Sequence, residues 1–332
     1  MALFKTQDIG IDLGTSSILV CVRDQGILYK EPSVVAISTD DNEPVAYGEE
    51  ARRMIGRTPD NIKAIHPLKH GVISNISLTE KLIKHYIEES LGKVSLRKPR
   101  VVICVPTNCT EIEKKAVEDA AIAAGSREVR VIEEPLAAAM GADIDVQKPE
   151  GSMIVDIGGG TTDIAVISLG GIVASRSVKT AGDDFDQAII DYLKTSYSLL
   201  VGDRTAENIK IEIGRAIPIE ENEPRKTMTV KGRNTQNGYP GDKIINDEDM
   251  YEALKNNVNN IVDGIKKVFE NTPPELAADI FEKGIYLTGG GSMLWGLDKA
   301  IANEVGVDVL TVDDPIKCVS KGLLKKLNEY DR

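Results

Sequence analysis

Cysteine and histidine are scarce in this sequence, which has 4 cysteines and 3 histidines among 332 residues. The cysteines show no C-x-x-C spacing, and most of them lie in apolar runs: Cys21, Cys104, Cys109 and Cys318. The histidines have no cysteine or acidic neighbour at the spacing of a metal site: His66, His70 and His85. We therefore expect free, buried thiols in a reducing compartment, and no metal site built on these side chains.

Long apolar runs and a surplus of basic residues are also missing. No apolar stretch approaches the roughly 18 residues of a membrane-spanning helix, and residues 1–6 become polar too early for a signal peptide. The net charge of −12 leaves no basic excess to neutralise the phosphates of nucleic acid. These absences predict a soluble cytoplasmic protein without nucleic-acid partners. With 332 residues, the chain is also long enough to form two lobes.

Two glycine-containing turns follow short apolar strands and share one plan. The first is IGIDLGTSS at residues 9–17, and the second is MIVDIGGGTTD at residues 153–163. In both, an aspartate at the end of a strand is followed by glycine and a hydroxyl residue. Glycine lets the backbone approach a polyphosphate closely, and successive N–H groups form an anion-binding nest. Either turn alone is more often an ordinary hairpin, but the repeat predicts two lobes that share one phosphate site.

A third apolar strand runs into glycines at residues 284–292 (GIYLTGGGS), and a helix is expected directly afterwards, over residues 294–305. A nucleotide base or ribose would fit against such a turn. Neither the pattern G-x-x-x-x-G-K-[ST] nor G-x-G-x-x-G occurs in the chain. The sequence therefore indicates a nucleotide site of a different class from the P-loop and Rossmann types.

Hydrophobic periodicity predicts strands that alternate with helices along the chain. The first half is expected to hold three strands within 8–36, a helix over 78–91, a strand over 100–105 and a helix over 111–124. The second half is expected to hold strands at 152–156, 163–168 and 171–178, helices at 185–200, 205–215, 247–269, 275–282 and 316–327, and a β hairpin over 227–245.

The three glycine motifs resemble the phosphate 1, phosphate 2 and adenosine motifs of the actin/Hsp70/sugar-kinase ATPase superfamily. Within that superfamily, the chain from about Asp8 to Leu327 resembles the bacterial actin family MreB and its close paralogues. The longer strings that carry the match are EPSVVA at 31–36, PRVVI at 99–103, IEEPLAAA at 132–139, ISLGGIV at 167–173, RTAENIKIEIG at 204–214 and TPPEL at 272–276.

This resemblance implies an α/β, actin-like ATPase fold. Two lobes of duplicated mixed-sheet (ribonuclease H-like) topology would surround a nucleotide cleft, each with a smaller insertion subdomain. Lobe I would cover 1–145 with its insertion at about 33–65, and lobe II would cover 146–314 with its insertion at about 181–245. Residues 315–332 would form a C-terminal helix that returns to lobe I.

Glu134 and Thr161 are the expected catalytic pair. Glu134 precedes Pro135, which favours an extended residue at Glu134 and a helix immediately after it, with the carboxylate facing the two turns. Hydrolysis of a γ-phosphate mainly requires an oriented water and neutralised charge, and the resemblance implies the same pair. The alternative for Glu134 is a helix-terminal acid favoured by the macrodipole. Asp12 and Asp156, at strand ends, are placed to hold the waters of a Mg²⁺ ion.

The phosphates of ATP or ADP are expected to contact Gly14, Thr15, Ser16, Gly158, Gly159, Gly160 and Thr161. The family's adenosine contacts would fall on Glu207, Asn208, Lys210, Gly289, Gly290, Gly291 and Ser292. Glu207 and Lys210 share one helix face, so the alternative for them is a solvated ion pair. Asp183 is expected either to bond the ribose hydroxyls or to cap the following helix.

The resemblance implies a slow ATPase coupled to filament state, in a cytoskeletal protein that polymerises at the inner face of the cell membrane and determines cell shape. Expected partners are further copies of the chain in paired protofilaments, an anionic membrane surface and membrane-bound morphogenesis proteins. Two alternatives share the fold. A small-molecule kinase would need a carboxylate base beside a polar substrate pocket, and no such signature is visible. A non-polymerising Hsp70-like ATPase would need a peptide-binding domain beyond the ATPase core.

Two groups of residues are predicted to meet the membrane. One is the turn after the helix over 78–91, with Lys93, Val94, Leu96, Arg97 and Lys98; the other lies near the C-terminus, with Lys321, Lys325 and Lys326. The family's membrane-inserting loop is commonly richer in bulky apolar residues, and the start of the chain has no convincing amphipathic helix. Electrostatic attachment is therefore predicted over insertion, the alternative being solvated loop and helix faces.

Overall fold

The computed structural model describes residues 7–91, 98–107, 109–220 and 223–329. Its first lobe is built on a mixed sheet of β1 (Ile9–Leu13), β2 (Ser17–Val22), β3 (Gly26–Pro32), β9 (Arg100–Val105) and β10 (Glu128–Glu133). The strand order is β10-β9-β1-β2-β3. β1, β2 and β3 pair antiparallel, whereas β1, β9 and β10 pair parallel. Helices α2 (Ile76–Leu91) and α3 (Glu111–Ala123) share a core with one face of this sheet.

The second lobe repeats this pattern. Its sheet contains β11 (Ser152–Ile157), β12 (Thr162–Ser168), β13 (Gly171–Val178), β17 (Ile285–Thr288) and β18 (Val309–Thr311), in the order β13-β12-β11-β17-β18. The first three strands are again antiparallel, and β17 and β18 extend the sheet in parallel from β11. The expected α/β fold of two lobes with duplicated mixed-sheet topology is therefore confirmed.

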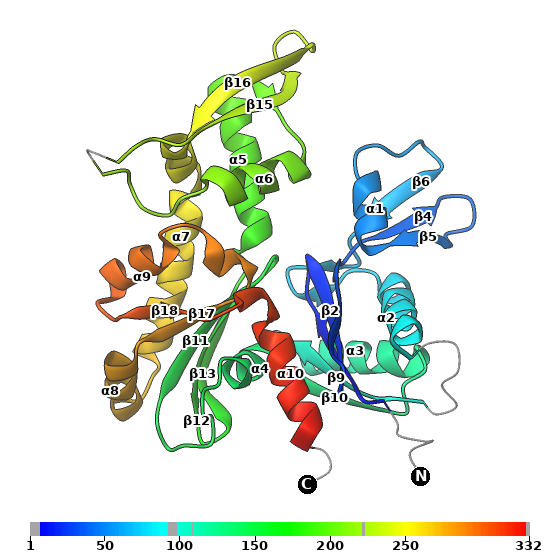
Figure 1. The fold of residues 1–332 in the computed structure, drawn as a ribbon, viewed down its shortest axis with the longest axis vertical. Helices are drawn as coiled ribbons and strands as arrows, with labels where there is room; N and C mark the ends of the chain where they lie inside the picture. Colours follow the sequence, from blue (N-terminus) through cyan, green and yellow to red (C-terminus); the bar gives the residue numbers. More distant parts are fainter. Residues whose placement is uncertain (1–6, 92–97, 108, 221–222, 330–332) are drawn as a thin grey trace.

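Each lobe also carries a smaller subdomain, and Figure 1 shows the two rising side by side above the large sheets. In the first lobe it contains β4 (Val35–Ser38), β5 (Pro44–Tyr47), α1 (Gly48–Met54) and β6 (Ile62–Ile65), followed by the short pair β7 (Leu68–Lys69) and β8 (Val72–Ile73). In the second lobe it contains α5 (Gly182–Tyr197), β14 (Leu199–Leu200), α6 (Asp203–Ile213), β15 (Thr227–Asn234) and β16 (Pro240–Asn246). The chain positions at which the lobes divide stay a prediction.

Two helices join the lobes: α4 (Glu134–Gly141) and α10 (Cys318–Glu329) lie between the two large sheets (Figure 1). They share one core with apolar side chains of both sheets, including Val102 of β9 and Ile154 of β11. The helices approach so closely that a Cβ on Gly322 would collide with the carbonyl oxygen of Ala137. This shared core closes the space between the lobes on the side of α4 and α10.

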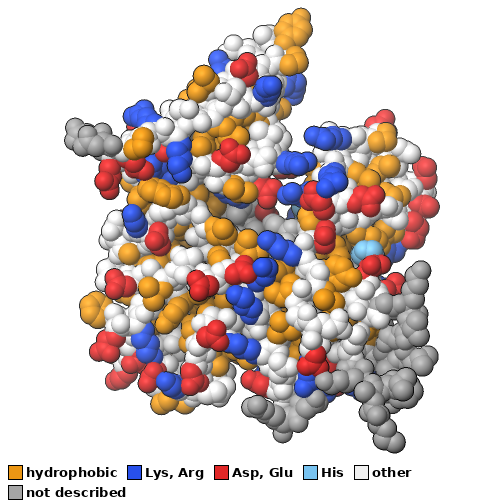
Figure 2. Space-filling view, viewed as in Figure 1, with side chains coloured by type: hydrophobic (Ala, Val, Ile, Leu, Met, Phe, Trp, Pro, Cys, Tyr) orange, Lys and Arg blue, Asp and Glu red, His pale blue; other side chains and the backbone are white. Residues whose placement is uncertain are grey.

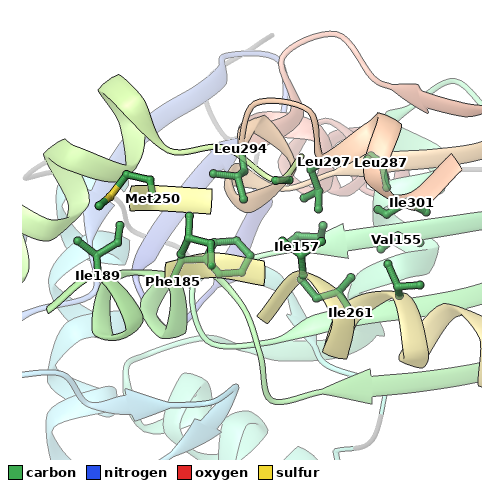
Figure 3. Close-up of a cluster of buried hydrophobic side chains, with 14 of the residues drawn as sticks. Val155, Ile157, Phe185, Ile189, Met250, Ile261, Leu287, Leu294, Leu297 and Ile301 are labelled. Atoms are coloured by element: carbon green, nitrogen blue, oxygen red, sulfur yellow. The ribbon is translucent and has the colours of Figure 1, made fainter. Parts of the chain in front are cut away.

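The second lobe has its own core, in which α7 (Asp247–Glu270), α8 (Pro274–Lys283) and α9 (Leu297–Val305) pack around its sheet. Figure 3 shows Phe185 and Ile189 of α5 beside Met250 of α7 and Ile157 of β11. Phe185, Ile157 and Met250 are completely buried. Because Phe185 lies in the first turn of α5, this packing fixes the start of that helix next to the second glycine turn.

Two element boundaries differ from expectation for physical reasons. The helix expected over 185–200 begins at Gly182 and stops at Tyr197, because Ser198 adopts a left-handed φ of 51° and Leu199 pairs with Asn234. The helix expected over 294–305 is present as α9 but starts three residues later, at Leu297, because the third glycine turn continues into a 3₁₀ turn, η1 (Gly290–Met293), and Gly296 before the helix has a left-handed φ of 76°. Within the described ranges, none of the helices combines the length and apolar character needed to cross a bilayer.

Candidate functional site

The three glycine turns meet in a cleft of about 600 Å³ between the lobes. Figure 2 shows the hollow beneath the two small subdomains, with side chains of both charges facing each other above it. The cleft is lined by residues of the first turn (14–17), the second (158–161) and the third (289–291). Asp12, Glu134 and Asp156 also line it, so the turns and the carboxylates expected from the sequence share one space.

The first and second turns touch each other directly. Each is closed by a backbone hydrogen bond: the Gly14 N–H donates to the Ser17 carbonyl at 3.1 Å, and the Gly158 N–H donates to the Thr161 carbonyl at 2.9 Å. A Cβ on Gly159 would collide with the side chain of Ser16. The lobes can therefore bring their backbones this close only with glycine at that position.

The start of α5 lies against the second turn. The N–H groups of Gly182 and Asp183 donate to the carbonyls of Gly158 and Gly159, at 3.1 and 2.8 Å. The Asp183 carboxylate accepts the Ser16 hydroxyl across the cleft at 2.5 Å, whereas Asp184 accepts the Ala181 N–H at the helix start. The helix-capping role considered for Asp183 is therefore wrong, and its contact with ribose stays a prediction.

Three carboxyl groups that line the cleft, Asp12, Glu134 and Asp156, lie near one another, and the buried Asp163 lies close to two of them. Burial raises the pKa of Asp12 from its ordinary value of 3.8 to about 7. Burial, and then the charges of Asp12 and Asp163, raise the pKa of Asp156 well above its usual range. Burial, followed by Asp163, Asp12 and Asp156, does the same to Glu134. A cation bound among these groups would relieve the repulsion between them.

The donor set fits a magnesium ion held through water. Among the described residues, no three His, Cys, Asp or Glu side chains are close enough together to ligate a metal directly. Mg²⁺ usually keeps several of its waters and binds one or two carboxylates together with substrate phosphates. Asp12 and Asp156 lie at the ends of corresponding strands in the two lobes, and both line the cleft below the glycine turns.

Glu134 begins α4 at the cleft floor. Glu133, with φ −76° and ψ 135°, is the extended residue that precedes the helix, and Pro135 lies within the first helical turn. The expected extended conformation at Glu134 is therefore wrong by one residue, because proline is tolerated in the first turn and lets the helix start before it. Glu134 and Thr161 both line the cleft, as the catalytic proposal requires.

Glu207 and Lys210 line the opposite end of the cleft, on α6. The Lys210 ammonium donates to the Gly182 carbonyl at 2.9 Å and pairs with Asp186 at 2.8 Å. Glu207 accepts a hydrogen bond from Arg52 at 2.8 Å. Each therefore has a different partner, which does not support the alternative of a solvated pair between them.

Two of the expected nucleotide contacts do not line the cleft. Asn208 is exposed on the outer side of α6. Ser292 is buried, and its hydroxyl donates to the Gly289 carbonyl at 2.7 Å. Its side chain therefore stabilises the third turn from within. The three glycines before Ser292 do line the cleft.

Several residues in the cleft or at the contact between the lobes have no signal in the sequence. Arg52 and Asp186 line the cleft. Thr107 of the first lobe donates from its N–H and its hydroxyl to the buried Asp163 carboxylate of the second, at 3.0 and 3.1 Å. Only Asp163 belongs to a motif, the second glycine turn. Arg52, Asp186 and Thr107 were not predicted, because the residues that they contact are distant in the sequence.

The residues predicted to meet a membrane fall into two groups. Lys93, Val94, Leu96 and Arg97 lie outside the described residues, and Lys98 beside them is exposed. Figure 2 shows a row of basic side chains over α10. Three lysines of this helix have partners: Lys325 donates to Asp143 at 2.5 Å, Lys326 to Glu329 at 2.9 Å and Lys321 to the Asp313 carbonyl at 3.3 Å. Neighbouring acids thus offset part of this charge.

Comparison with known proteins gives the relatives of this chain. The sequence model of the MreB/Mbl protein family matches residues 6–332. The cell shape-determining protein Mbl of Bacillus subtilis is 48% identical over 326 residues, which cover 98% of this chain and 97% of Mbl. The cell shape-determining protein MreB of Escherichia coli is 46% identical over 331 residues, which cover 98% of this chain and 94% of MreB.

Solved structures agree with the sequence relatives. The crystal structure of MreB5 of Spiroplasma citri bound to ADP superposes with a TM-score of 0.92 at 35% identity, covering 98% of this chain and 97% of that one. The same protein bound to AMPPNP gives a TM-score of 0.91. The family match, the near-complete coverage and the shared actin-like fold lead to one conclusion: this chain belongs to the MreB/Mbl family.

Proposed function

We propose that this chain binds ATP or ADP with Mg²⁺ in the cleft and hydrolyses ATP to ADP and phosphate. One observation carries the proposal: a glycine turn from each lobe meets the other in a cleft that the carboxylates of Asp12, Glu134 and Asp156 also line. The ADP and AMPPNP complexes of the related MreB5 support it.

The chain's own groups are suited to each part of the reaction. Backbone N–H groups of the first two turns would hold the phosphates, because such turns form anion-binding nests. Glu134 would accept a hydrogen bond from the attacking water, with the Thr161 hydroxyl as its second contact, so that the water is oriented toward the γ-phosphate. Burial and neighbouring carboxylates raise the pKa of Glu134 well above its usual range, and a cation bound nearby would favour the ionised carboxylate that accepts this hydrogen bond. Bound magnesium would neutralise phosphate charge.

The chain would also polymerise with copies of itself, in paired protofilaments, and so determine cell shape. The names of the related Mbl and MreB proteins, and their near-complete coverage, support this role. The filaments would lie in the cytoplasm at the inner face of the cell membrane, held by anionic lipids or by membrane-bound morphogenesis proteins. Because one nucleotide would contact both lobes, its state would set their relative tilt and hence filament stability.

Sedimentation of the purified protein tests the proposal. Protein incubated with Mg²⁺ and ATP, ADP or no nucleotide would be centrifuged, and released phosphate would be measured in parallel. We expect phosphate release and a pelleted fraction that depends on the nucleotide. Equal pelleting in all three conditions would contradict the coupling, and phosphate release without any pelleting would favour a non-polymerising ATPase of the same fold.

A further inference from the structure

An ion pair crosses the mouth of the cleft between the small subdomains. Nη1 of Arg52, on α1 of the first lobe, lies 2.8 Å from Oε2 of Glu207, on α6 of the second lobe. The two side chains are 33% and 38% exposed, and both residues line the cleft. The pair therefore links the lobes at the end of the cleft away from the catalytic carboxylates.

Arg52 is held firmly on the first lobe. Its Nε donates to the Glu49 carboxylate at 2.9 Å. The backbone N–H of Glu49 in turn donates to the carboxylate of Glu31 at 2.8 Å, and Glu31 belongs to β3 of the large sheet. The guanidinium is thus connected to the central sheet through two successive hydrogen bonds.

The helix that carries Glu207 is attached to the core of the second lobe. One turn further along α6, Lys210 donates to the Gly182 carbonyl and pairs with Asp186 of α5. Gly182 is itself bonded to the second glycine turn. Because Arg52 and Glu207 lie on elements attached to different lobes, their ion pair opposes separation of the lobes at this end.

We propose that Arg52 is a positioning residue of the nucleotide site, acting through Glu207. It holds the Glu207 carboxylate at the nucleoside end and keeps the mouth closed, so that nucleotide leaves only when this ion pair opens. The inference rests on the proposed function, because it concerns the release of nucleotide from the same cleft. An ion pair that is about one third exposed is weak, and so the expected effect on release is about 2–5-fold.

The test is the dissociation rate of a fluorescent ADP, chased with excess unlabelled ADP in the presence of Mg²⁺. Arg52→Ala is expected to accelerate release about 2–5-fold, and Arg52→Lys, which keeps the charge, to restore most of the difference. Arg53→Ala is the matched control, because the Arg53 side chain is 69% exposed and pairs with Glu49 of its own helix. Release from this control is expected at the wild-type rate.

A double-mutant cycle separates positioning from a general loosening of the fold. In a Glu207→Gln background, Arg52→Ala should accelerate release no further, because its partner is already lost. Equal acceleration in both backgrounds, or none in the wild-type background, would overturn the inference. If Arg52→Ala does not fold, the same release rates would be measured with Arg52→Gln in its place. Failure of the wild-type protein to bind fluorescent ADP would refute the proposed function instead.

Discussion

Glu134 is the residue on which the proposed chemistry depends. Glu134→Ala should lower the rate of ATP hydrolysis by about 10²-fold, the lower end of what a positioned proton-handling group contributes. Nucleotide should still bind, because both glycine turns remain. Phosphate release and nucleotide binding would be measured for this variant and for Glu133→Ala, a neighbour that does not line the cleft. Hydrolysis at the wild-type rate in Glu134→Ala would remove Glu134 from the mechanism.

Asp12 should make magnesium nucleotide binding depend on pH. Its pKa is about 7 in the cleft and 3.8 ordinarily. Below pH 7 a proton must therefore leave before the cation binds, so the apparent affinity should be about tenfold weaker at pH 6 than at pH 8. Without ligand, the folded protein holds a proton that the unfolded chain has lost. The contribution of Asp12 to stability therefore falls as pH rises from about 4 to 7.

Thermal unfolding with and without Mg²⁺ and ADP would check this dependence. The rise in Tm on adding them should be larger at pH 8 than at pH 6, and Asp12→Asn should reduce the difference between the two pH values. A ligand-induced rise in Tm that is the same at both pH values in the wild-type protein would contradict the role of Asp12.

At the residue scale, local motifs revealed part of the site. The glycine turns and the aspartates before them are adjacent in the sequence, so their chemistry was visible there. Arg52 was not predictable, because its partner Glu207 lies 155 residues further along the chain. Asn208 was predicted from its motif, but its side chain is exposed on the outer side of α6. Which face of α6 points into the cleft depends on how this helix packs against α5, and the sequence does not show that.

At the element scale, the crossing of α4 and α10 controls how the lobes are joined. Gly322→Ala should place a methyl group against the carbonyl oxygen of Ala137. Since this neighbour is helix backbone, the helices must move apart. Overpacking of this kind typically lowers the free energy of unfolding by about 1–3 kcal/mol.

Denaturant unfolding of Gly322→Ala would measure that loss. Gly202→Ala is the control, because a Cβ at Gly202, before α6, would have no neighbour within 4 Å. We expect Gly202→Ala to unfold close to the wild-type midpoint. Equal midpoints for Gly322→Ala and the wild type would show that the two helices are not in such close contact.

Periodicity predicted the helices and strands well, and it placed the starts of some of them, such as the helix over 111–124. In the structure, a capping box of Thr110 and Glu113 fixes the start of this helix locally. The start of α5 at Gly182 depends instead on hydrogen bonds to the second glycine turn. Contacts between elements, rather than local preference, decided that boundary.

At the scale of the whole molecule, attachment to a membrane is the open prediction. If the basic row over α10 and the turn near Lys98 attach filaments by charge, assembled protein should pellet with anionic vesicles at low salt. It should be released at about 0.5 M salt, where charges are strongly screened. The lysines of each copy are partly neutralised by neighbouring acids, but many copies along one filament would bind the membrane together and so compensate for the weak attachment of each copy.

Vesicle co-sedimentation with ATP would measure this attachment, with neutral vesicles and protein alone as controls. Pelleting that is equal on neutral and anionic vesicles and unchanged by salt would refute attachment by charge and would instead indicate inserted apolar side chains. No pelleting with vesicles beyond that of the filaments alone would refute direct membrane binding.

The sequence by itself determined the two-lobed α/β architecture, because the repeated strand–aspartate–glycine pattern is local and occurs once in each half. It likewise predicted that the two glycine turns and Glu134 share one cleft, because each of these motifs is local in the sequence. Only the tertiary structure decided how the lobes meet: the contact of Gly159 with Ser16, the ion pair of Arg52 with Glu207 and the shared core around α10. These contacts join residues far apart in the chain, and their geometry depends on the packing of whole elements rather than on any local pattern.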